Sequence, residues 1–166
     1  MHGIIGTREI VNDSWAYPFL RKSRVARLAT SSKDGIPHVV PICFAFDGKM
    51  FYVSIDTKPK RVEPTNLRRV RNISENPRVS IVVDYYTEDW RKLRYVIVQG
   101  LAKIIHSSSE HKRAATLLRR KYRQYLSMSI DRRPIIGIRP MKLVAWRSSA
   151  RPLERLRNGS GIGEMT

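Results

Sequence analysis

Residues 36–55 contain the stretch that decides the fold: Ile36-Pro-His-Val-Val-Pro-Ile-Cys-Phe-Ala-Phe46, then Asp47-Gly48, then Met50-Phe-Tyr-Val-Ser-Ile55. Both apolar runs are rich in β-branched and aromatic residues, which favour extended strands. An Asp-Gly pair between two such runs is a strong hairpin signal. Pro37 and Pro41 cannot donate a hydrogen bond to a β-ladder, so we expect the first run at a sheet edge or a bulge.

A cluster of cations, Lys58-Pro59-Lys60-Arg61, follows the second run. A strand that ends in a short basic loop offers fixed positive charge, and Arg and Lys bind phosphate through charge-assisted hydrogen bonds. Pro59 restricts the loop, so less entropy is lost when an anion docks. The alternative is a solvated charge run in a basic protein. The loop by itself favours neither interpretation.

The rest of the chain alternates between strand and helix patterns. Six strands with sequential hairpins and three peripheral helices predict an α+β domain, most simply a six-stranded antiparallel β-barrel. One domain is expected over residues 1–150, followed by a flexible C-terminal tail over residues 151–166. The predicted strands are 25–30, 36–46, 49–55, 79–86, 93–105 and 138–147, and the predicted helices are 8–22, 63–76 and about 109–126.

Three local signals refine this pattern. Pro18 lies inside the first helix and is expected to end or kink it. Gly100 is expected to mark a β-bulge in the strand over 93–105. Ser107-x-x-Glu110 has the form of a capping box and is expected to begin the third helix.

Charge is the outlying feature of the composition. The 166 residues carry 32 Lys and Arg against 14 Asp and Glu, a formal net charge of +18. Such a field attracts anions, which include nucleic acids, anionic membranes and phosphorylated small molecules. Cys43 is the single cysteine, so no intramolecular disulfide can form, and this fits a reducing cytoplasm. The N-terminal residues lack the pattern of a signal peptide, and no apolar run approaches the length of a membrane helix.

Recognisable catalytic and metal-binding motifs are missing. One Cys and four scattered His residues have no zinc-ligand spacing, so we predict no metal site. Phosphate-binding glycine loops and serine-nucleophile motifs are also absent. No catalytic side chain can therefore be named. An enzyme with such a sequence would depend on the chemistry of a bound cofactor.

The order of several segments resembles a known family. The segments are Arg24-Val-Ala-Arg-Leu-Ala-Thr30, Asp34-Gly-Ile-Pro-His-Val-Val-Pro-Ile-Cys-Phe44, Phe51-Tyr-Val-Ser-Ile-Asp56, Lys58-Pro-Lys-Arg61, and Asn66-Leu-Arg-Arg69 with Arg71-Asn-Ile-Ser-Glu-Asn-Pro-Arg-Val79. As an ordered set they are similar to the split β-barrel proteins that bind flavin or deazaflavin and are related to pyridoxamine 5′-phosphate oxidase. The resemblance is greatest to the branch usually labelled as probable coenzyme F-420-dependent. It covers about residues 20–105 and continues weakly to Trp146.

The resemblance implies a homodimer with two cofactor sites at the subunit interface, each holding FMN or coenzyme F-420. It places one group of residues along the ribityl chain and phosphate, a second behind the ring, a third beside the ring or ribityl chain, and a fourth on the phosphate. The partner chain's Asp89-Trp90 region would close over the ring, although Trp90 could equally be a dimer-core aromatic. The residues along the ribityl chain and phosphate are Arg27, Ala29 and Thr30, and those behind the ring are Pro41, Ile42 and Cys43. Ser54 and Ile55 would lie beside the ring or ribityl chain, and Lys58, Lys60 and Arg61 would bind the phosphate.

The resemblance also implies a function, a cytoplasmic oxidoreductase that transfers a hydride between FMN or coenzyme F-420 and a small substrate. The segment Trp146-Arg-Ser-Ser-Ala-Arg-Pro152 lacks the arginine-histidine signature of a pyridoxamine phosphate oxidase, so vitamin B6 oxidation is the less expected activity. One alternative is a cofactor-binding protein without turnover. A nucleic-acid-binding protein is less expected, because most aromatic residues fall in apolar strand patterns and not among the cations.

Overall fold

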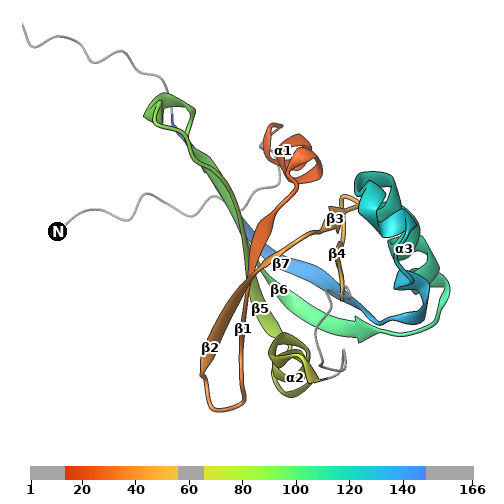
Figure 1. Cartoon of the computed structure of the whole chain (residues 1–166). Coiled ribbons are helices and arrows are strands. Elements are labelled where there is room, and N and C mark those ends of the chain that lie inside the picture. Colours follow the sequence, from red (N-terminus) through yellow and green to blue (C-terminus); the bar gives the residue numbers. More distant parts are fainter. Residues whose placement is uncertain (1–13, 56–65, 149–166) are drawn as a thin grey trace, which may run out of the picture.

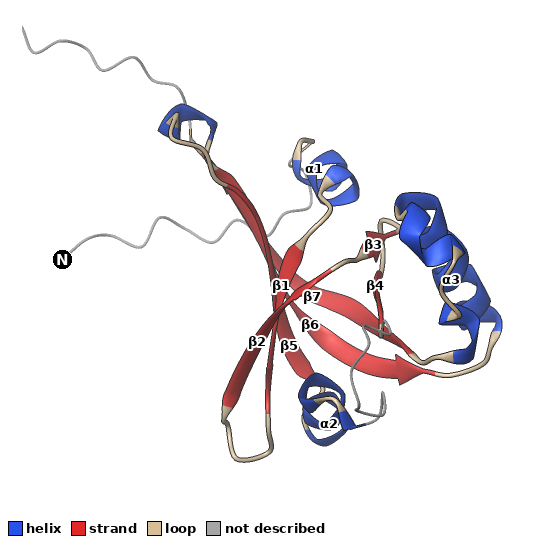
Figure 2. Ribbon diagram, in the orientation of Figure 1, coloured by secondary structure: helices blue, strands red, loops and turns tan. Residues whose placement is uncertain are grey.

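The computed structural model describes residues 14–55 and 66–148. These residues form one antiparallel sheet of seven strands with helices around it, as Figures 1 and 2 show. Short 3-10 helices, η2 to η4, interrupt the loops. In chain order the elements are α1 (Ala16–Lys22), β1 (Ala26–Ser31), β2 (Pro37–Ile42), β3 (Ala45–Phe46), β4 (Phe51–Ser54), α2 (Arg68–Glu75), β5 (Arg78–Tyr85), η2 (Trp90–Lys92), β6 (Arg94–Ile105), α3 (Ser109–Lys121), η3 (Arg123–Leu126), η4 (Ile130–Arg132) and β7 (Ile135–Arg147).

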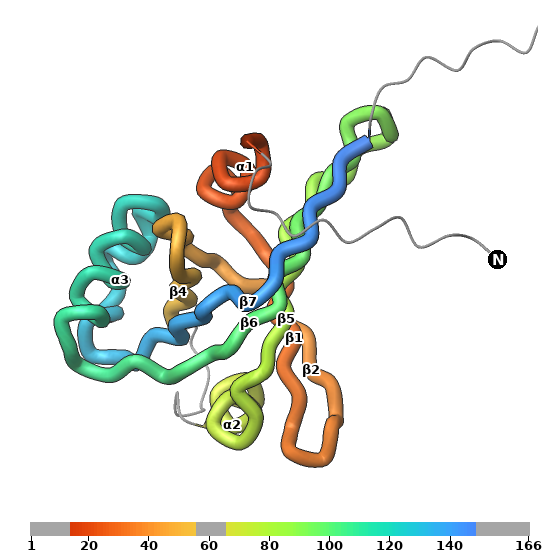
Figure 3. Tube along the Cα trace, turned by 180° about the vertical axis from the view of Figure 1, so that it is seen from behind, coloured from red at the N-terminus to blue at the C-terminus, as the bar shows by residue number. Residues whose placement is uncertain are grey.

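The two edges of the sheet come from one continuous segment. The strand order is β2-β1-β5-β6-β7-β4-β3, and only Cys43 and Phe44 separate the end of β2 from the start of β3. Three Cα–Cα steps span at most about 11 Å, so the sheet has to curl until its outer strands approach each other. Figure 3 shows the resulting half-barrel from behind. The predicted α+β split β-barrel is confirmed, with seven strands instead of six because the chain leaves the ladder at this corner.

The Tyr122 side chain hydrogen-bonds the backbone at the corner between β2 and β3. Its hydroxyl oxygen accepts a hydrogen bond from Phe44 N–H at 3.0 Å and lies 2.7 Å from the Arg24 carbonyl and 2.8 Å from the Phe44 carbonyl. Burial raises the pKa of Tyr122 to about 12, so the hydroxyl keeps its proton and can donate it to one of these carbonyls. Backbone groups that have left a ladder need such partners when they are buried.

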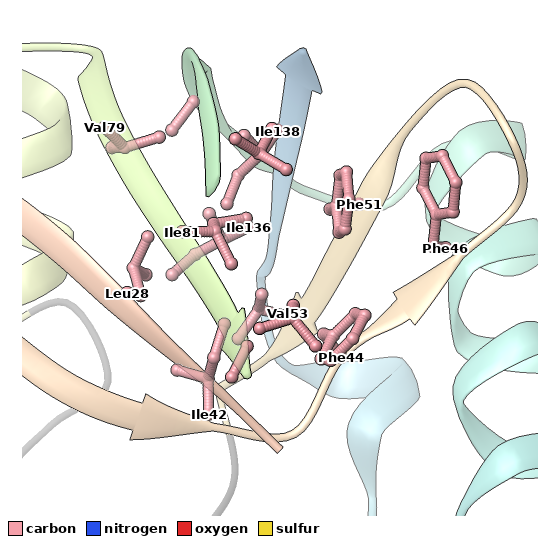
Figure 4. Close-up of a cluster of buried hydrophobic side chains, with 14 of the residues drawn as sticks. Leu28, Ile42, Phe44, Phe46, Phe51, Val53, Val79, Ile81, Ile136 and Ile138 are labelled. Atoms are coloured by element: carbon pink, nitrogen blue, oxygen red, sulfur yellow. The ribbon is translucent and has the colours of Figure 1, made fainter. Parts of the chain in front are cut away.

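The interior of the half-barrel is filled with apolar side chains from every strand and from α1 and α2. Figure 4 shows the part of this core where Phe46 and Phe51 stack across the β3–β4 hairpin, with ring centroids 4.3 Å apart. The predicted Asp47-Gly48 hairpin is confirmed. Gly48 has a φ of 102°, which glycine adopts without strain, and the Asp47 carboxylate accepts the N–H groups of Lys49 and Met50.

A β-bulge interrupts the pairing of β6 with β7 at Gly100, as the sequence predicted. Gln99 pairs with Lys142 but Gly100 pairs with Pro140, so Met141 is the extra residue of β7. A Cβ at Gly100 would lie 2.5 Å from the Arg139 carbonyl oxygen, so only glycine fits this close approach of two strands.

The helices differ from their predicted limits. Pro18 lies in the first turn of α1, where a missing N–H costs little, and it neither ends nor kinks the helix. Ser108, not Ser107, caps α3 by accepting the His111 N–H. α3 stops at Lys121 because Tyr122 takes an extended conformation. The predicted helical residues 8–13 and 63–65, and the predicted tail over 151–166, lie outside the described residues.

Removing the Tyr122 hydroxyl tests its role at the corner. Tyr122→Phe should lower the free energy of unfolding by about 1–3 kcal/mol, because the buried Phe44 N–H then lacks a partner. Urea denaturation followed by circular dichroism measures the change. Tyr17→Phe is the matched control, since Tyr17 is exposed in α1, and should change stability by less than about 0.5 kcal/mol. Equal stability of the two variants would contradict the assignment.

Candidate functional site

The outer face of the sheet, which is the face turned away from the core, brings several predicted site residues together. Along β1, Ala26, Leu28 and Thr30 are buried, whereas Arg27 and Ala29 alternate with them and point outward. The register places Pro41 of β2 opposite Arg27 on the same outer face. The structure therefore groups Arg27, Ala29 and Pro41.

A cleft of about 450 Å³ opens beside β1. This volume falls in the range of sites for cofactors and small substrates, which is roughly 300–1,000 Å³. Two predicted residues, Ala29 and Thr30, contribute to its wall. The remaining wall combines polar and apolar residues from the end of β1 and from β2, β5, β6 and β7, namely Ser31, Pro37, Arg78, Val79, Ser80, Gln99, Gly100, Leu101 and Met141.

Arg27 is already engaged in the ligand-free chain. Its guanidinium forms an ion pair with the Asp84 carboxylate on β5, and both side chains are partly exposed. An exposed pair of this kind contributes little stability, so an anionic ligand can replace Asp84 at low energetic cost. The predicted role of Arg27 beside the ribityl chain or phosphate stays a prediction.

Thr30 faces the core with its side chain. Its hydroxyl oxygen accepts a hydrogen bond from the Asn72 amide at 3.0 Å, which ties β1 to α2. Ile42 is likewise buried in the main core, because it follows Pro41 and adjacent residues of a strand point to opposite faces. The three predicted wall residues Pro41, Ile42 and Cys43 therefore do not share one face.

Ser54 and Ile55 end the β4 segment, immediately before the basic loop. Ile55 is fully buried in the main core. The Ser54 hydroxyl is buried and has no hydrogen-bond partner among residues 14–55 and 66–148, which is unusual because an unsatisfied buried hydroxyl is destabilising. A ligand with polar groups along its chain would supply that partner. Lys58, Lys60 and Arg61 lie outside the described residues.

Trp90 lies far along the chain from these groups, in η2 at the tip of the β5–β6 hairpin. Figure 2 shows this hairpin as an arm that projects from the half-barrel. The indole is 68% exposed. The Asp89 side chain accepts the Arg91 N–H and also pairs with Lys92, so the tip has a defined turn. Closure of Trp90 over a partner's cofactor stays a prediction.

Sequence reasoning missed four polar residues of the cleft, Ser31, Arg78, Ser80 and Gln99. The available signal was the alternation of small polar and apolar residues in Val79-Ser80-Ile81, which marks a strand with one solvent-facing side. Across the described ranges 14–55 and 66–148, no group of His, Cys, Asp and Glu could hold a metal ion. Within the same ranges no helix is long and apolar enough to cross a membrane.

A buried amine, also missed, lies near Cys43. The Lys121 ammonium lies 4.0 Å from the centroid of the Phe44 ring and has no hydrogen-bond partner within the described part of the chain. Burial, together with the charge of Arg24, lowers the pKa of Lys121 to about 8, against an opposing effect of Cys43. Lys121 lies next to other cations in the last turn of α3, so the helical pattern alone does not distinguish this buried lysine from its neighbours.

The lowered pKa of Lys121 makes the free energy of unfolding depend on pH. Between about pH 8 and 10.5 the unfolded chain holds the Lys121 proton while the folded chain releases it, so stability rises with pH. Lys121→Met should therefore raise the thermal midpoint at pH 7, and the gain should shrink towards pH 10. Lys112→Met, exposed on the same helix, is the matched control in calorimetry at pH 7, 8, 9 and 10. A gain from Lys121→Met that does not change with pH would contradict the prediction.

The half-barrel and its outer cleft agree with a match to a family model described as pyridoxamine 5′-phosphate oxidase, which covers residues 16–147. The chain belongs to the pyridoxamine 5′-phosphate oxidase family. The family resemblance predicted from the ordered segments is thereby confirmed.

Three similar proteins show the range of similarity. A 5a,11a-dehydrotetracycline/5a,11a-dehydrooxytetracycline reductase of Streptomyces rimosus is 30% identical over 96 residues, which are 57% of this chain and 65% of that protein. A solved structure of an F420 reductase is 26% identical with a TM-score of 0.60, covering 80% of this chain and 98% of that one. The heme storage protein of Vibrio cholerae has a TM-score of 0.62 at 14% identity, over 81% and 93% of the two chains, and so shares the fold.

Proposed function

We propose that the chain is a cytoplasmic, homodimeric oxidoreductase that binds FMN or coenzyme F-420 and acts on a small substrate. The observation that carries the proposal is the cleft of about 450 Å³ beside Ala29 and Thr30, in a chain of the pyridoxamine 5′-phosphate oxidase family. The reductase names of two similar proteins support an oxidoreductase. Either cofactor, when bound, would supply the hydride chemistry that the chain's own side chains lack.

The chain's residues would bind and orient the cofactor. Lys58, Lys60 and Arg61 follow β4 in sequence and carry the charge for a phosphate. The unpartnered Ser54 hydroxyl is suited to a hydrogen bond with the ribityl chain. Pro41 and Ala29 offer apolar surface to a flat ring on the outer face.

A cofactor carrier without turnover is the second candidate. Arg78 is the only charged residue on the described wall of the cleft, and no His, Asp, Glu, Lys or Cys lies there. General acid or base catalysis needs such a group within hydrogen-bond reach. Turnover assays with reduced cofactor and varied acceptors separate the two candidates, because a carrier reoxidises no cofactor faster than solution does.

Cofactor titration tests the site. Binding of FMN or coenzyme F-420 should change the fluorescence of the cofactor, and Lys60→Ala should weaken binding at least about tenfold because a charge-assisted bond is worth 1.5–3 kcal/mol. Ser54→Ala should leave the unfolding free energy unchanged or higher while it weakens binding. Lys33→Ala, in the β1–β2 turn, is the matched control. Failure of both cofactors to bind, in a protein that is folded, would overturn the proposal.

A second copy of the chain is proposed to cover the outer face. Strand register aligns Val82, Ile97 and Val144 beside Arg27, and Tyr95 stacks on Trp146 with ring centroids 5.5 Å apart. Val39 and Trp146 are 60% and 42% exposed. A contiguous apolar strip on a sheet face is typical of a protein interface.

Sedimentation equilibrium checks the dimer. The protein should sediment at twice the mass of the chain, and Val144→Glu should shift it towards the monomer because a carboxylate would be buried without a partner. Leu126→Glu, an exposed position on η3, is the matched control. A wild-type protein that stays monomeric at micromolar concentration would contradict the assignment.

A further inference from the structure

The outward face of α3 carries cations that the cofactor site does not use. Its exposed residues between Lys112 and Arg120 are Lys112, Arg113, Thr116 and Arg120, and Arg123 follows in η3. Helical spacing aligns Lys112, Thr116 and Arg120 in a stripe about 12 Å long. α3 covers the β3–β4 side of the half-barrel, apart from the arm of β5 and β6, as Figure 1 shows.

The two carboxylates nearest to this face in the sequence are already paired with other cations. Glu110 pairs with Lys103, and Asp131 pairs with Arg119. In the described part of the chain, Lys112, Arg120 and Arg123 form no ion pair. Arg113 donates a hydrogen bond to the buried Tyr52 hydroxyl at 2.9 Å, which fixes its guanidinium on the surface. The outward face of α3, together with Arg123, therefore presents four cations, and Arg113 is held in place.

We propose that this face of α3 binds the phosphate backbone of a nucleic acid duplex, independently of sequence. Arginine guanidinium groups match phosphate oxygens in a fork geometry, and three of the four cations are arginines. The exposed residues of α3 offer no apolar patch, which a protein partner would need at the core of an interface. The net charge of +18 far exceeds the need of one cofactor phosphate and attracts a polyanion at long range.

This binding mode differs from base stacking. Tyr122 and Tyr125, the aromatic residues next to these cations, are buried and cannot stack on exposed bases. Contacts to the phosphate backbone need no aromatic side chain and carry no sequence information. The sequence-based expectation against nucleic acid rested on stacking and does not apply to backbone contacts.

The salt dependence of duplex binding tests the proposal. Fluorescence anisotropy with labelled 20-base-pair duplexes of DNA and of RNA, between 50 and 200 mM NaCl, should give log–log slopes of roughly −3 to −4 for four phosphate contacts. Lys112→Gln/Arg120→Gln/Arg123→Gln should flatten the slope by about two to three and weaken binding at 50 mM NaCl at least tenfold. Circular dichroism should show that the variant is folded, because all three positions are exposed.

Two further variants make the result decisive. Lys33→Gln/Arg91→Gln/Lys92→Gln removes the same charge elsewhere on the surface, and it should change the slope by less than one. Lys112→Arg/Arg120→Lys/Arg123→Lys keeps the charge and should keep the slope. Equal losses from the two neutralised variants would overturn the proposal in favour of general attraction. Polyglutamate that displaces the duplex at equal charge concentration would also overturn it, in favour of an acidic polymer.

Discussion

Two residues, Cys43 and Phe44, join the opposite edges of one sheet, and the rest of the structure depends on this short link. A flat sheet of seven strands would hold its edges several strand spacings apart. The chain therefore has to close, and the closed side needs partners for the backbone groups that leave the ladder. Tyr122 provides them from the end of α3, so the helix and the sheet corner stabilise each other.

Closure also decides where a ligand can bind. The inside of the half-barrel is occupied by side chains such as Leu28, Phe44 and Ile136, all fully buried. Close-packed interiors leave no room for a cofactor-sized molecule. The proposed cofactor site therefore lies on the outer face, where β1 and β2 present Arg27, Ala29 and Pro41. The proposed second copy of the chain would cover this face.

The sequence predicted what depends on local pattern and left undetermined what depends on tertiary contact. The Asp47-Gly48 hairpin, the bulge at Gly100 and the edge position of the proline-containing strand follow from backbone chemistry that each residue carries with it. The break after Ile42 does not, because the run to Phe46 is uniformly apolar and nothing local marks a corner. The resemblance also named Ile42 and Thr30, whose side chains face the core; Thr30 still contributes to the cleft wall, and the roles of both residues stay predictions.

The extra residue Met141 sets the phase of β7. Before it, Ile136 and Ile138 face the core; after it, Leu143 and Ala145 do, so the inward positions change from even to odd numbers. The parts of β7 before and after Met141 therefore alternate in opposite phase. Loss of Met141 would make Gly100–Pro140 and Gln99–Lys142 successive regular pairs, so Leu143 and Ala145 would still face the core. The extra residue therefore contributes the local bend of β7 and leaves the choice of inward-facing residues after it to the regular pairing.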